Sequence, residues 1–208
     1  MIYVSFDIGV KNLALCVIKE YQDNVSIIDW RIISLAESKK EIKGENEISE
    51  RLYVELDNII GTLNELGIST IGTVLIENQP SNINGIMKTI QLLIFSYFNL
   101  LKHWDNIVKN VILVNASLKL QTHSIIPPSR QDNKVKYTRR QKYINNKNDS
   151  IEVCKYYIKN TEKLLNFLNS NKKLDDFADT FLQTISYIRK NGNKIESVSL
   201  DDINILGL

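Results

Sequence analysis

The sequence has little cysteine, histidine or proline. It contains two cysteines, Cys16 and Cys154, two histidines and three prolines among 208 residues. Two thiols so far apart in the chain build neither a disulfide framework nor a zinc site, so we expect both to be reduced. No Ser-His-Asp or Cys-His arrangement for covalent catalysis is recognisable, and we expect His103 and His123 to be structural or surface residues.

Long apolar runs and an excess of either charge are missing as well. The chain has 26 Lys and Arg residues against 24 Asp and Glu residues, a formal net charge of +2. No apolar run reaches the roughly 18 residues of a membrane span, and the acid at position 7 argues against a signal peptide. We therefore expect a soluble intracellular protein whose affinity for nucleic acid, if any, depends on where its basic residues lie.

The sequence does contain enough apolar material for a hydrophobic core. Hydrophobic residues make up 43% of the chain and charged residues 24%, the balance of an ordinary globular protein. The length suits one α/β domain and falls short of two. We therefore predict a single domain over residues 1–208, with an uninformative C-terminal tail over 191–208.

Apolar periodicity predicts a mixed α/β fold. Alternation with period two indicates a strand over 2–8, and runs of β-branched or apolar residues indicate the other strands, whereas apolar residues spaced by three and four indicate helices. The predicted strands are 2–8, 13–19, 25–35, 72–76 and 111–114, and the predicted helices are 45–66, 83–101 and 175–189. This order predicts a five-stranded sheet, in which three antiparallel strands are followed by parallel strands, flanked by helices.

The helix predicted over 83–101 has two apolar sides. Leu92, Phe95 and Leu100 lie away from its main apolar stripe. Such a helix is either central in the fold or a core helix whose second face meets a partner. We favour the second interpretation.

The composition changes at Pro127. The stretch over about 127–147 holds seven basic residues and one acid, Asp132, with Tyr137 and Tyr143 among the cations. Its prolines and scarce apolar residues predict an exposed segment, followed by a helix capped by Asp149 or Ser150. The segment can be a solvated loop, or it can contact the phosphates of nucleic acid. Its basic residues are Arg130, Lys134, Lys136, Arg139, Arg140, Lys142 and Lys147.

Four acids are placed where their charge needs an explanation. Asp7 ends the first predicted strand in FDIG, and Glu77 ends a buried strand in VLIEN. Asp176 and Asp179 are three apart near the start of the last helix, so they share one helix face. Asp175 and Asp179 also share a face at a spacing of four, so spacing alone does not choose between Asp175 and Asp176.

Carboxylates gathered at one sheet edge repel each other unless cations neutralise them. Oxygen ligands suit Mg²⁺ or Mn²⁺, and two such ions about 4 Å apart can activate a water and stabilise the leaving oxygen in phosphodiester cleavage. Each acid also has a structural explanation, since Asp7 can bond turn amides and acids near a helix N-terminus favour the helix dipole. Only the combination of all four points to a metal site.

Four motifs together resemble a known family. FDIGVKN, VLIENQPSN, YTRRQKY and KKLDDFADTFLQ are similar, in this order, to motifs of the poxvirus Holliday-junction resolvases, relatives of bacterial RuvC and of the yeast mitochondrial junction resolvases. The resemblance covers nearly the whole chain. It implies an RNase H-like nuclease domain of the retroviral-integrase superfamily that works as a homodimer in the host cytoplasm. It also implies Mg²⁺-dependent paired nicking of four-way DNA junctions in viral recombination, leaving 5′-phosphate and 3′-hydroxyl ends.

The resemblance also assigns site residues. The acids of the family, which hold two Mg²⁺ ions or Mn²⁺ in their place, fall on Asp7, Glu77, Asp176 and Asp179, which settles the choice against Asp175. Lysines near the scissile phosphate fall on Lys119 and Lys147, and the basic segment over 127–147 is expected to bind DNA. The helix over 83–101 is the candidate dimer interface. The loop after Glu77 departs from RuvC, which carries an aromatic residue where this chain has Asn78-Gln79-Pro80.

Three other functions are compatible with parts of the pattern. A ribonuclease H acting on RNA–DNA hybrids would have a similar fold and acidic site. A catalytically silent junction-binding module would keep the fold without the chemistry. Actin-like and sugar-kinase ATPases also open with a strand that ends in Asp-x-Gly, but they need a second phosphate-binding loop and about twice the length. No organic cofactor and no membrane partner are expected.

Overall fold

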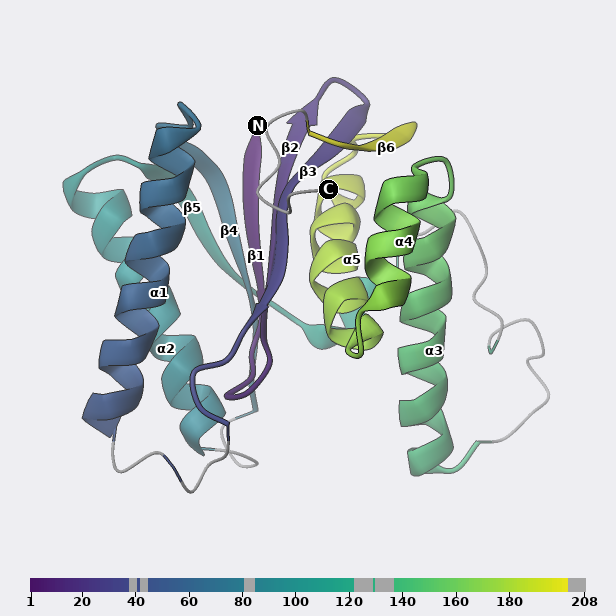
Figure 1. Cartoon of the computed structure of the whole chain (residues 1–208), viewed down its shortest axis with the longest axis horizontal. Helices are drawn as coiled ribbons and strands as arrows, with labels where there is room; N and C mark the ends of the chain where they lie inside the picture. The colour runs from purple at the N-terminus through teal and green to yellow at the C-terminus, as the bar shows by residue number, and fades with distance from the viewer. Residues whose placement is uncertain (38–40, 42–44, 81–84, 122–128, 130–136, 202–208) are drawn as a thin grey trace.

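The computed structural model describes residues 1–37, 41, 45–80, 85–121, 129 and 137–201. In these residues a six-stranded mixed sheet has the order β5-β4-β1-β2-β3-β6 (Figure 1). β1 pairs antiparallel with β2 and β2 with β3, whereas β1–β4, β4–β5 and β3–β6 are parallel. The strands are β1 (Ile2–Asp7), β2 (Leu13–Tyr21), β3 (Asn24–Ile33), β4 (Ile71–Glu77), β5 (Val108–Val114) and β6 (Ser197–Leu200).

Helices cover both faces of the sheet. α1 and α2 pack on one face, and α3, α4 and α5 lie on the other (Figure 1). A short 3₁₀ helix, η2, follows β5. The helices are α1 (Glu45–Glu65), α2 (Gly85–Trp104), η2 (Ala116–Leu120), α3 (Arg139–Ile158), α4 (Glu162–Ser170) and α5 (Leu174–Lys190). The predicted mixed α/β fold is confirmed, with one strand more than the five expected.

Successive side chains of β1 point to opposite faces of the sheet, and helices cover both faces. Val4 and Phe6 belong to the core beneath α1 and α2, whereas Tyr3 belongs to the core beneath α5. On that second side Trp30 of β3 is fully buried, and its indole Nε1 donates to the carbonyl of Phe177 at 3.0 Å. A strand packed on both faces needs apolar residues at nearly every position, as the central strands have.

The parallel pairing of β1 with β4 brings two of the predicted acids to one edge. Ser5 is opposite Leu75, and Phe6 is opposite Ile76. Because parallel strands end at the same edge of a sheet, Asp7 and Glu77 leave the sheet side by side. The pairing of these two strands, which are about 70 residues apart in the chain, thus places both carboxylates at one edge of the sheet.

The start of α3 differs from the prediction. The helix begins at Arg139, not after Lys147, so the predicted cap at Asp149 or Ser150 is wrong. Thr138 caps it instead: the Thr138 hydroxyl accepts from the Gln141 amide at 3.3 Å, and the Gln141 side chain accepts from the Thr138 amide at 3.0 Å. This reciprocal capping box starts a helix whose first turns are too polar to show an apolar stripe.

Asp149 has another task inside the helix. It is 1% exposed and accepts hydrogen bonds from both the amide and the hydroxyl of Ser129. The part of the predicted exposed segment that the structure describes is therefore mostly the first half of α3. Most of its polar side chains there are exposed as expected, although Asn145 and Lys147 are partly buried, but the backbone is helical.

Two further elements were not predicted. β6 adds four residues in parallel to the end of the sheet beside β3, inside the stretch expected to be a tail. α4 is a nine-residue helix between α3 and α5, with Leu164 and Leu168 buried. Both elements are too short to give a clear period, so packing rather than sequence pattern defines them.

Candidate active site

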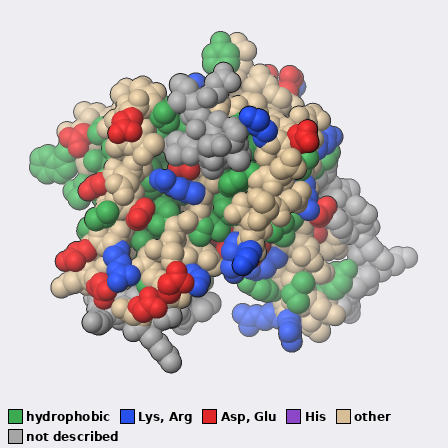
Figure 2. All heavy atoms as spheres, in the orientation of Figure 1, with side chains coloured by type: hydrophobic (Ala, Val, Ile, Leu, Met, Phe, Trp, Pro, Cys, Tyr) green, Lys and Arg blue, Asp and Glu red, His purple; other side chains and the backbone are tan. Residues whose placement is uncertain are grey.

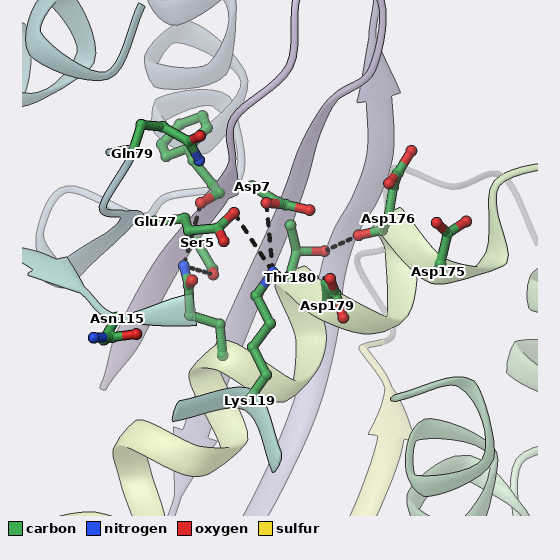
Figure 3. Close-up of polar contacts among 12 residues, drawn as sticks. Ser5, Asp7, Glu77, Gln79, Asn115, Lys119, Asp175, Asp176, Asp179 and Thr180 are labelled. Carbon is green, nitrogen blue, oxygen red and sulfur yellow. Dashed lines mark hydrogen bonds and ion pairs between the residues drawn. The ribbon is translucent and has the colours of Figure 1, made fainter. Parts of the chain in front are cut away.

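The four predicted acids come from three elements and line one cavity. Asp7 ends β1, Glu77 ends β4, and Asp176 and Asp179 lie in the first turns of α5. All four border a cavity of about 510 Å³, to which Lys119 of η2 also contributes. The geometry expected from the motifs, with acids from distant segments gathered at one sheet edge, is present in the structure (Figure 3).

Lys119 lies at the centre of this acid cluster. Its ammonium Nζ is 2.9 Å from Asp179 Oδ2, 3.5 Å from Asp7 Oδ1 and 3.5 Å from Glu77 Oε2. The residue is 5% exposed. Figure 3 shows these three carboxylates around the ammonium, whereas Asp175 lies apart from them. Lys119 was expected near the reacting phosphate, and the structure places it among the acids themselves.

Burial changes the acidity of the cluster. It raises the pKa of Asp7 to about 8, with a further upward contribution from Glu77 that Lys119 opposes. Burial, together with Asp175 and Asp7, raises the pKa of Asp176 to about 6. Burial also raises the pKa of Asp179, although Lys119 acts in the opposite direction. The raised pKa values show that burial makes these acids costly to ionise. A bound cation would lower that cost.

The same burial acts on the lysine with the opposite sign. Desolvation on its own would lower the pKa of Lys119, but Asp7, Asp179 and Glu77 raise it by more, so the ammonium stays charged. Lys119 pairs with three of the four carboxylates, whereas Lys147, which also lines the cavity, pairs with Asp175. If all four acids are ionised, the cluster carries an excess of negative charge.

Gln183 ties together the elements that carry the acids. Its side-chain Nε2, fully buried on α5, donates to the Ser5 hydroxyl at 2.9 Å, to the Phe6 carbonyl at 3.2 Å and to the Leu75 carbonyl at 3.3 Å. Gln183 is one turn after Asp179, and its partners precede Asp7 and Glu77 by one or two residues. Gln183 was not among the predicted site residues, although a glutamine within the apolar stretch of the last motif is a usable signal.

Asp175 is paired away from the cluster. Its carboxylate forms an ion pair with the Lys147 ammonium of α3, and it does not line the cavity. Burial would raise the pKa of Asp175, but the hydrogen bond and charge of Lys147 bring it below its usual value. Lys147 does line the cavity, so its predicted position near the site fits, but it lies inside α3 rather than before a helix.

The predicted DNA-binding residues divide into described and undescribed positions. Arg139, Arg140 and Lys142 are exposed on the first turn of α3. Figure 2 shows basic side chains over the lower end of α3 and charges of both signs elsewhere on that face. Three further residues lie outside the described residues: Arg130, Lys134 and Lys136.

The acid cluster has the ligand atoms that divalent cations prefer, but its side chains are not arranged as a coordination sphere. Four carboxylates offer hard oxygen ligands in a partly buried cavity, which suits Mg²⁺ or Mn²⁺. Among the described residues, no three His, Cys, Asp or Glu side chains are already arranged to hold a metal ion. Lys119 lies between the carboxylates, so the acids would have to draw together around a cation and away from the ammonium.

No helix in the described part of the chain is both long and apolar enough to cross a membrane.

A family model covers the part of the chain that carries two of the acids. Residues 128–191 match the model described as Poxvirus A22 protein. The matched stretch contains α3, α4 and α5, and with them Asp176, Asp179 and Gln183. It does not reach the acids of β1 and β4, which the fold brings to the same cavity.

Solved structures of junction resolvases share the fold. The fowlpox virus resolvase, solved with substrate Holliday junction DNA, has a TM-score of 0.57 and 22% identity, covering 92% of this chain and 99% of that chain. The yeast mitochondrial Holliday junction resolvase Ydc2 has a TM-score of 0.56 and 15% identity, covering 90% and 78%. RuvC of Thermus thermophilus has a TM-score of 0.51 and 12% identity, covering 93% and 99%.

The predicted resemblance to the poxvirus Holliday-junction resolvases is confirmed. The chain has the RNase H-like fold that the resemblance implied. A curated relative from Acanthamoeba polyphaga mimivirus, "Uncharacterized protein L451", is 30% identical over 151 residues, which are 68% of this chain and 34% of that protein. The chain thus spans about a third of the length of this mimivirus relative.

Proposed function

We propose that this chain is a single nuclease domain that resolves four-way DNA junctions by metal-dependent paired nicking. Its biological setting would be viral DNA recombination in the host cytoplasm. The observation that carries the proposal is the convergence of Asp7, Glu77, Asp176 and Asp179, from three separate segments, on one cavity beside the cations of α3. The family match over α3 to α5 and the fold shared with junction resolvases support the same reading.

The four acids would hold two Mg²⁺ ions, or Mn²⁺ in their place. When bound, the ions would supply the activation of a water molecule and the stabilisation of the leaving oxygen. Asp7, which lies between Glu77 and the α5 pair, would be among the residues that hold these ions. No protein nucleophile is needed, and the expected products carry 5′-phosphate and 3′-hydroxyl ends.

The lysines act on the phosphate rather than on the metal. Lys119 is held within reach of three acids by charge, so its ammonium can turn to a phosphate oxygen once cations neutralise those acids. Lys147, at the other side of the cavity, is held by Asp175. Arg139, Arg140 and Lys142 would contact phosphates farther along the strand, which adds affinity but little sequence information.

A homodimer would match the symmetry of the substrate. A four-way junction has two-fold character, so a symmetric dimer places one active site on each of two opposed strands. The candidate interface is the helix over 83–101, described from Gly85 as α2, on which Leu92 is 50% exposed and Leu100 54% exposed. Exposed apolar residues on a helix that also packs into the core favour a partner on this face.

The test is a comparison of substrates. Synthetic immobile four-way junction, linear DNA duplex and RNA–DNA hybrid are incubated with the protein and Mg²⁺, and Asp7→Asn is the control variant. The proposal predicts cleavage of the junction in preference to both other substrates, lost in Asp7→Asn. Cleavage of the hybrid alone would instead assign a ribonuclease H, and tight junction binding without cleavage in any divalent ion would assign a silent binding module.

A further inference from the structure

Tyr143 is an exposed aromatic residue at the rim of the acid cavity. It is 61% exposed, on the second turn of α3, and it lines the same cavity as the four acids. Burying an aromatic ring is favourable, so a tyrosine this exposed beside a polar site contributes little to the fold. A ring in that position is available to a ligand that enters the cavity.

The neighbours of Tyr143 are suited to nucleic acid. Asn146, Lys147 and Ser150, which follow it at spacings of three, four and seven, line the cavity as well. The Lys147 ammonium is 5.1 Å from the centre of the Tyr143 ring, and its ion pair with Asp175 of α5 fixes this side of α3 against the acid cluster. An aromatic ring flanked by cations is the combination that binds unpaired bases and their phosphates together.

We propose that Tyr143 is a stacking platform for a base at the branch point, one of whose faces is not stacked on a neighbouring base, next to the phosphate that lies at the acid cluster. This inference rests on the proposed function and adds a residue that selects the substrate. In a continuous duplex both faces of each base are already stacked on neighbours. A branch point offers a base with a free face, so the ring gains contact only with interrupted helices.

Tyr143 therefore differs in role from the basic residues around it. Arg139, Arg140 and Lys142 contact phosphates, which duplex and branched DNA present alike. The ring distinguishes between them, because only a base outside a continuous stack can reach it. Loss of the ring should lower the preference for junctions while leaving affinity for linear duplex unchanged.

The same helix supplies a matched control. Tyr156 is 41% exposed on α3 and has the Lys159 ammonium 4.2 Å from its ring centre, so its local chemistry resembles that of Tyr143. It lines a different cavity, together with Ile195, Glu196 and Val198, and none of the four acids of the active-site cluster lines that cavity. Tyr156→Ala removes a similar ring from the same helix at a distance from the proposed site.

The experiment measures stacking and selectivity together. A four-way junction carrying 2-aminopurine at the branch point is bound to Asp7→Asn protein, and the fluorescence quenching is compared with and without Tyr143→Ala. In the otherwise wild-type protein, kcat/KM on junction and affinity for linear duplex are measured for Tyr143→Ala, Tyr143→Phe and Tyr156→Ala. Thermal unfolding of each variant reports on folding, and Tyr143→Phe separates the loss of the ring from the loss of its hydroxyl.

We expect Tyr143→Ala to lose the quenching and to lower kcat/KM on junction by roughly 5- to 150-fold, the range for loss of one base–aromatic stack. Tyr143→Phe should keep both, and Tyr156→Ala should match the wild type. Quenching and cleavage unchanged in Tyr143→Ala, or an equal loss on junction and duplex, would overturn the inference and leave the proposed function standing. A wild-type protein that neither binds nor cuts a junction would overturn both.

Discussion

Lys119 is a buried cation whose loss should lower the free energy of unfolding of the protein. Three carboxylates lie within 3.5 Å of its ammonium, at 5% exposure. Removing one partner from such a group leaves uncompensated buried charge, which costs about 3–5 kcal/mol. We predict that Lys119→Met lowers the free energy of unfolding by this amount in EDTA at pH 7, measured by urea denaturation.

Divalent cations should recover part of that loss, because they neutralise the same acids. Lys102→Met, at an exposed lysine of α2, is the matched control and should leave stability nearly unchanged. Equal stabilities of Lys119→Met and Lys102→Met would show that Lys119 does not hold the cluster together.

Asp29 gives a separate prediction about pH. It is 2% exposed, Arg31 Nε lies 3.1 Å from its Oδ2, and its Oδ1 has no hydrogen-bond partner among the described residues. Burial raises the pKa of Asp29, although Arg31 and the Trp30 amide act against it. The folded protein therefore holds this proton more tightly than the unfolded chain, and this contribution to stability falls as the pH rises from about 4 through the raised pKa.

Asp29→Asn should remove that fall. Relative to the wild type, the variant's urea midpoint should improve as the pH increases from 4 to 7, whereas Asp23→Asn, at an exposed acid, should follow the wild type throughout. Parallel curves for Asp29→Asn and wild type would contradict the assigned pKa direction.

At the scale of elements, α5 must be held in one position against β1 and β4. Gln183 does this through three hydrogen bonds of 2.9–3.3 Å to Ser5, Phe6 and Leu75. Replacing it by leucine keeps the bulk but leaves buried acceptors without that donor, at a cost of about 1–3 kcal/mol. Without these hydrogen bonds we expect α5 to shift relative to β1 and β4, and Asp179, one turn before Gln183, to shift with it.

We therefore predict that Gln183→Leu is less stable and also needs roughly tenfold more Mn²⁺ for half-maximal thermal stabilisation. Misaligned acids that cost about 1.4 kcal/mol of binding free energy would raise the Kd for Mn²⁺ tenfold. Thr184→Val is the control, since Thr184 is equally buried on α5 and its hydroxyl has no hydrogen-bond partner among the described residues. If both variants shift the Mn²⁺ midpoint alike, Gln183 does not position the acids.

The elements also show what the sequence could and could not predict. Strong periods located β1 and α5, and a short run of branched residues located β4. The parallel pairing of β1 with β4 brought Asp7 and Glu77 together as expected. The start of α3 depends on a capping box at Thr138 rather than on apolar spacing, and β6 depends on pairing with β3. Patterns of hydrophobicity carry neither signal.

The acids of the site could be predicted from the sequence, but the contacts that Lys119 and Gln183 make there could not. The resemblance named Asp7, Glu77, Asp176 and Asp179, and all four line one cavity. The position of Lys119 between the acids follows from the path of η2 after β5, which no local pattern encodes. Gln183 stands out in the sequence as a glutamine in an apolar stretch, but its role is recognisable only when its three acceptors on two strands are seen together.

At the scale of the whole molecule, α2 presents its second apolar face to the exterior. Leu92 and Leu100 are about half exposed there, although Ile90, Ile94 and Phe98 of the same helix are buried.

We predict that the wild type sediments as a dimer at micromolar concentration and that Leu100→Glu shifts it to monomer, because a buried unpaired charge opposes association. Tyr21→Glu, at a residue 69% exposed on β2, should stay dimeric. A monomeric wild type would remove α2 as an interface.

The most direct test of the account is to map the nicks on a four-way junction. Each strand of an immobile junction is labelled in turn, and the wild type is compared with Asp175→Asn, Asp176→Asn and Asp179→Asn in Mg²⁺. We predict paired nicks in opposed strands, lowered at least about 100-fold in Asp176→Asn and Asp179→Asn, since several kcal/mol of charge stabilisation depend on the metal ligands. Asp175→Asn should retain cutting, because the Asp175 carboxylate pairs with Lys147 and does not itself line the cavity. No cleavage by the wild type in any divalent ion, or full cleavage by Asp179→Asn, would contradict the central claim.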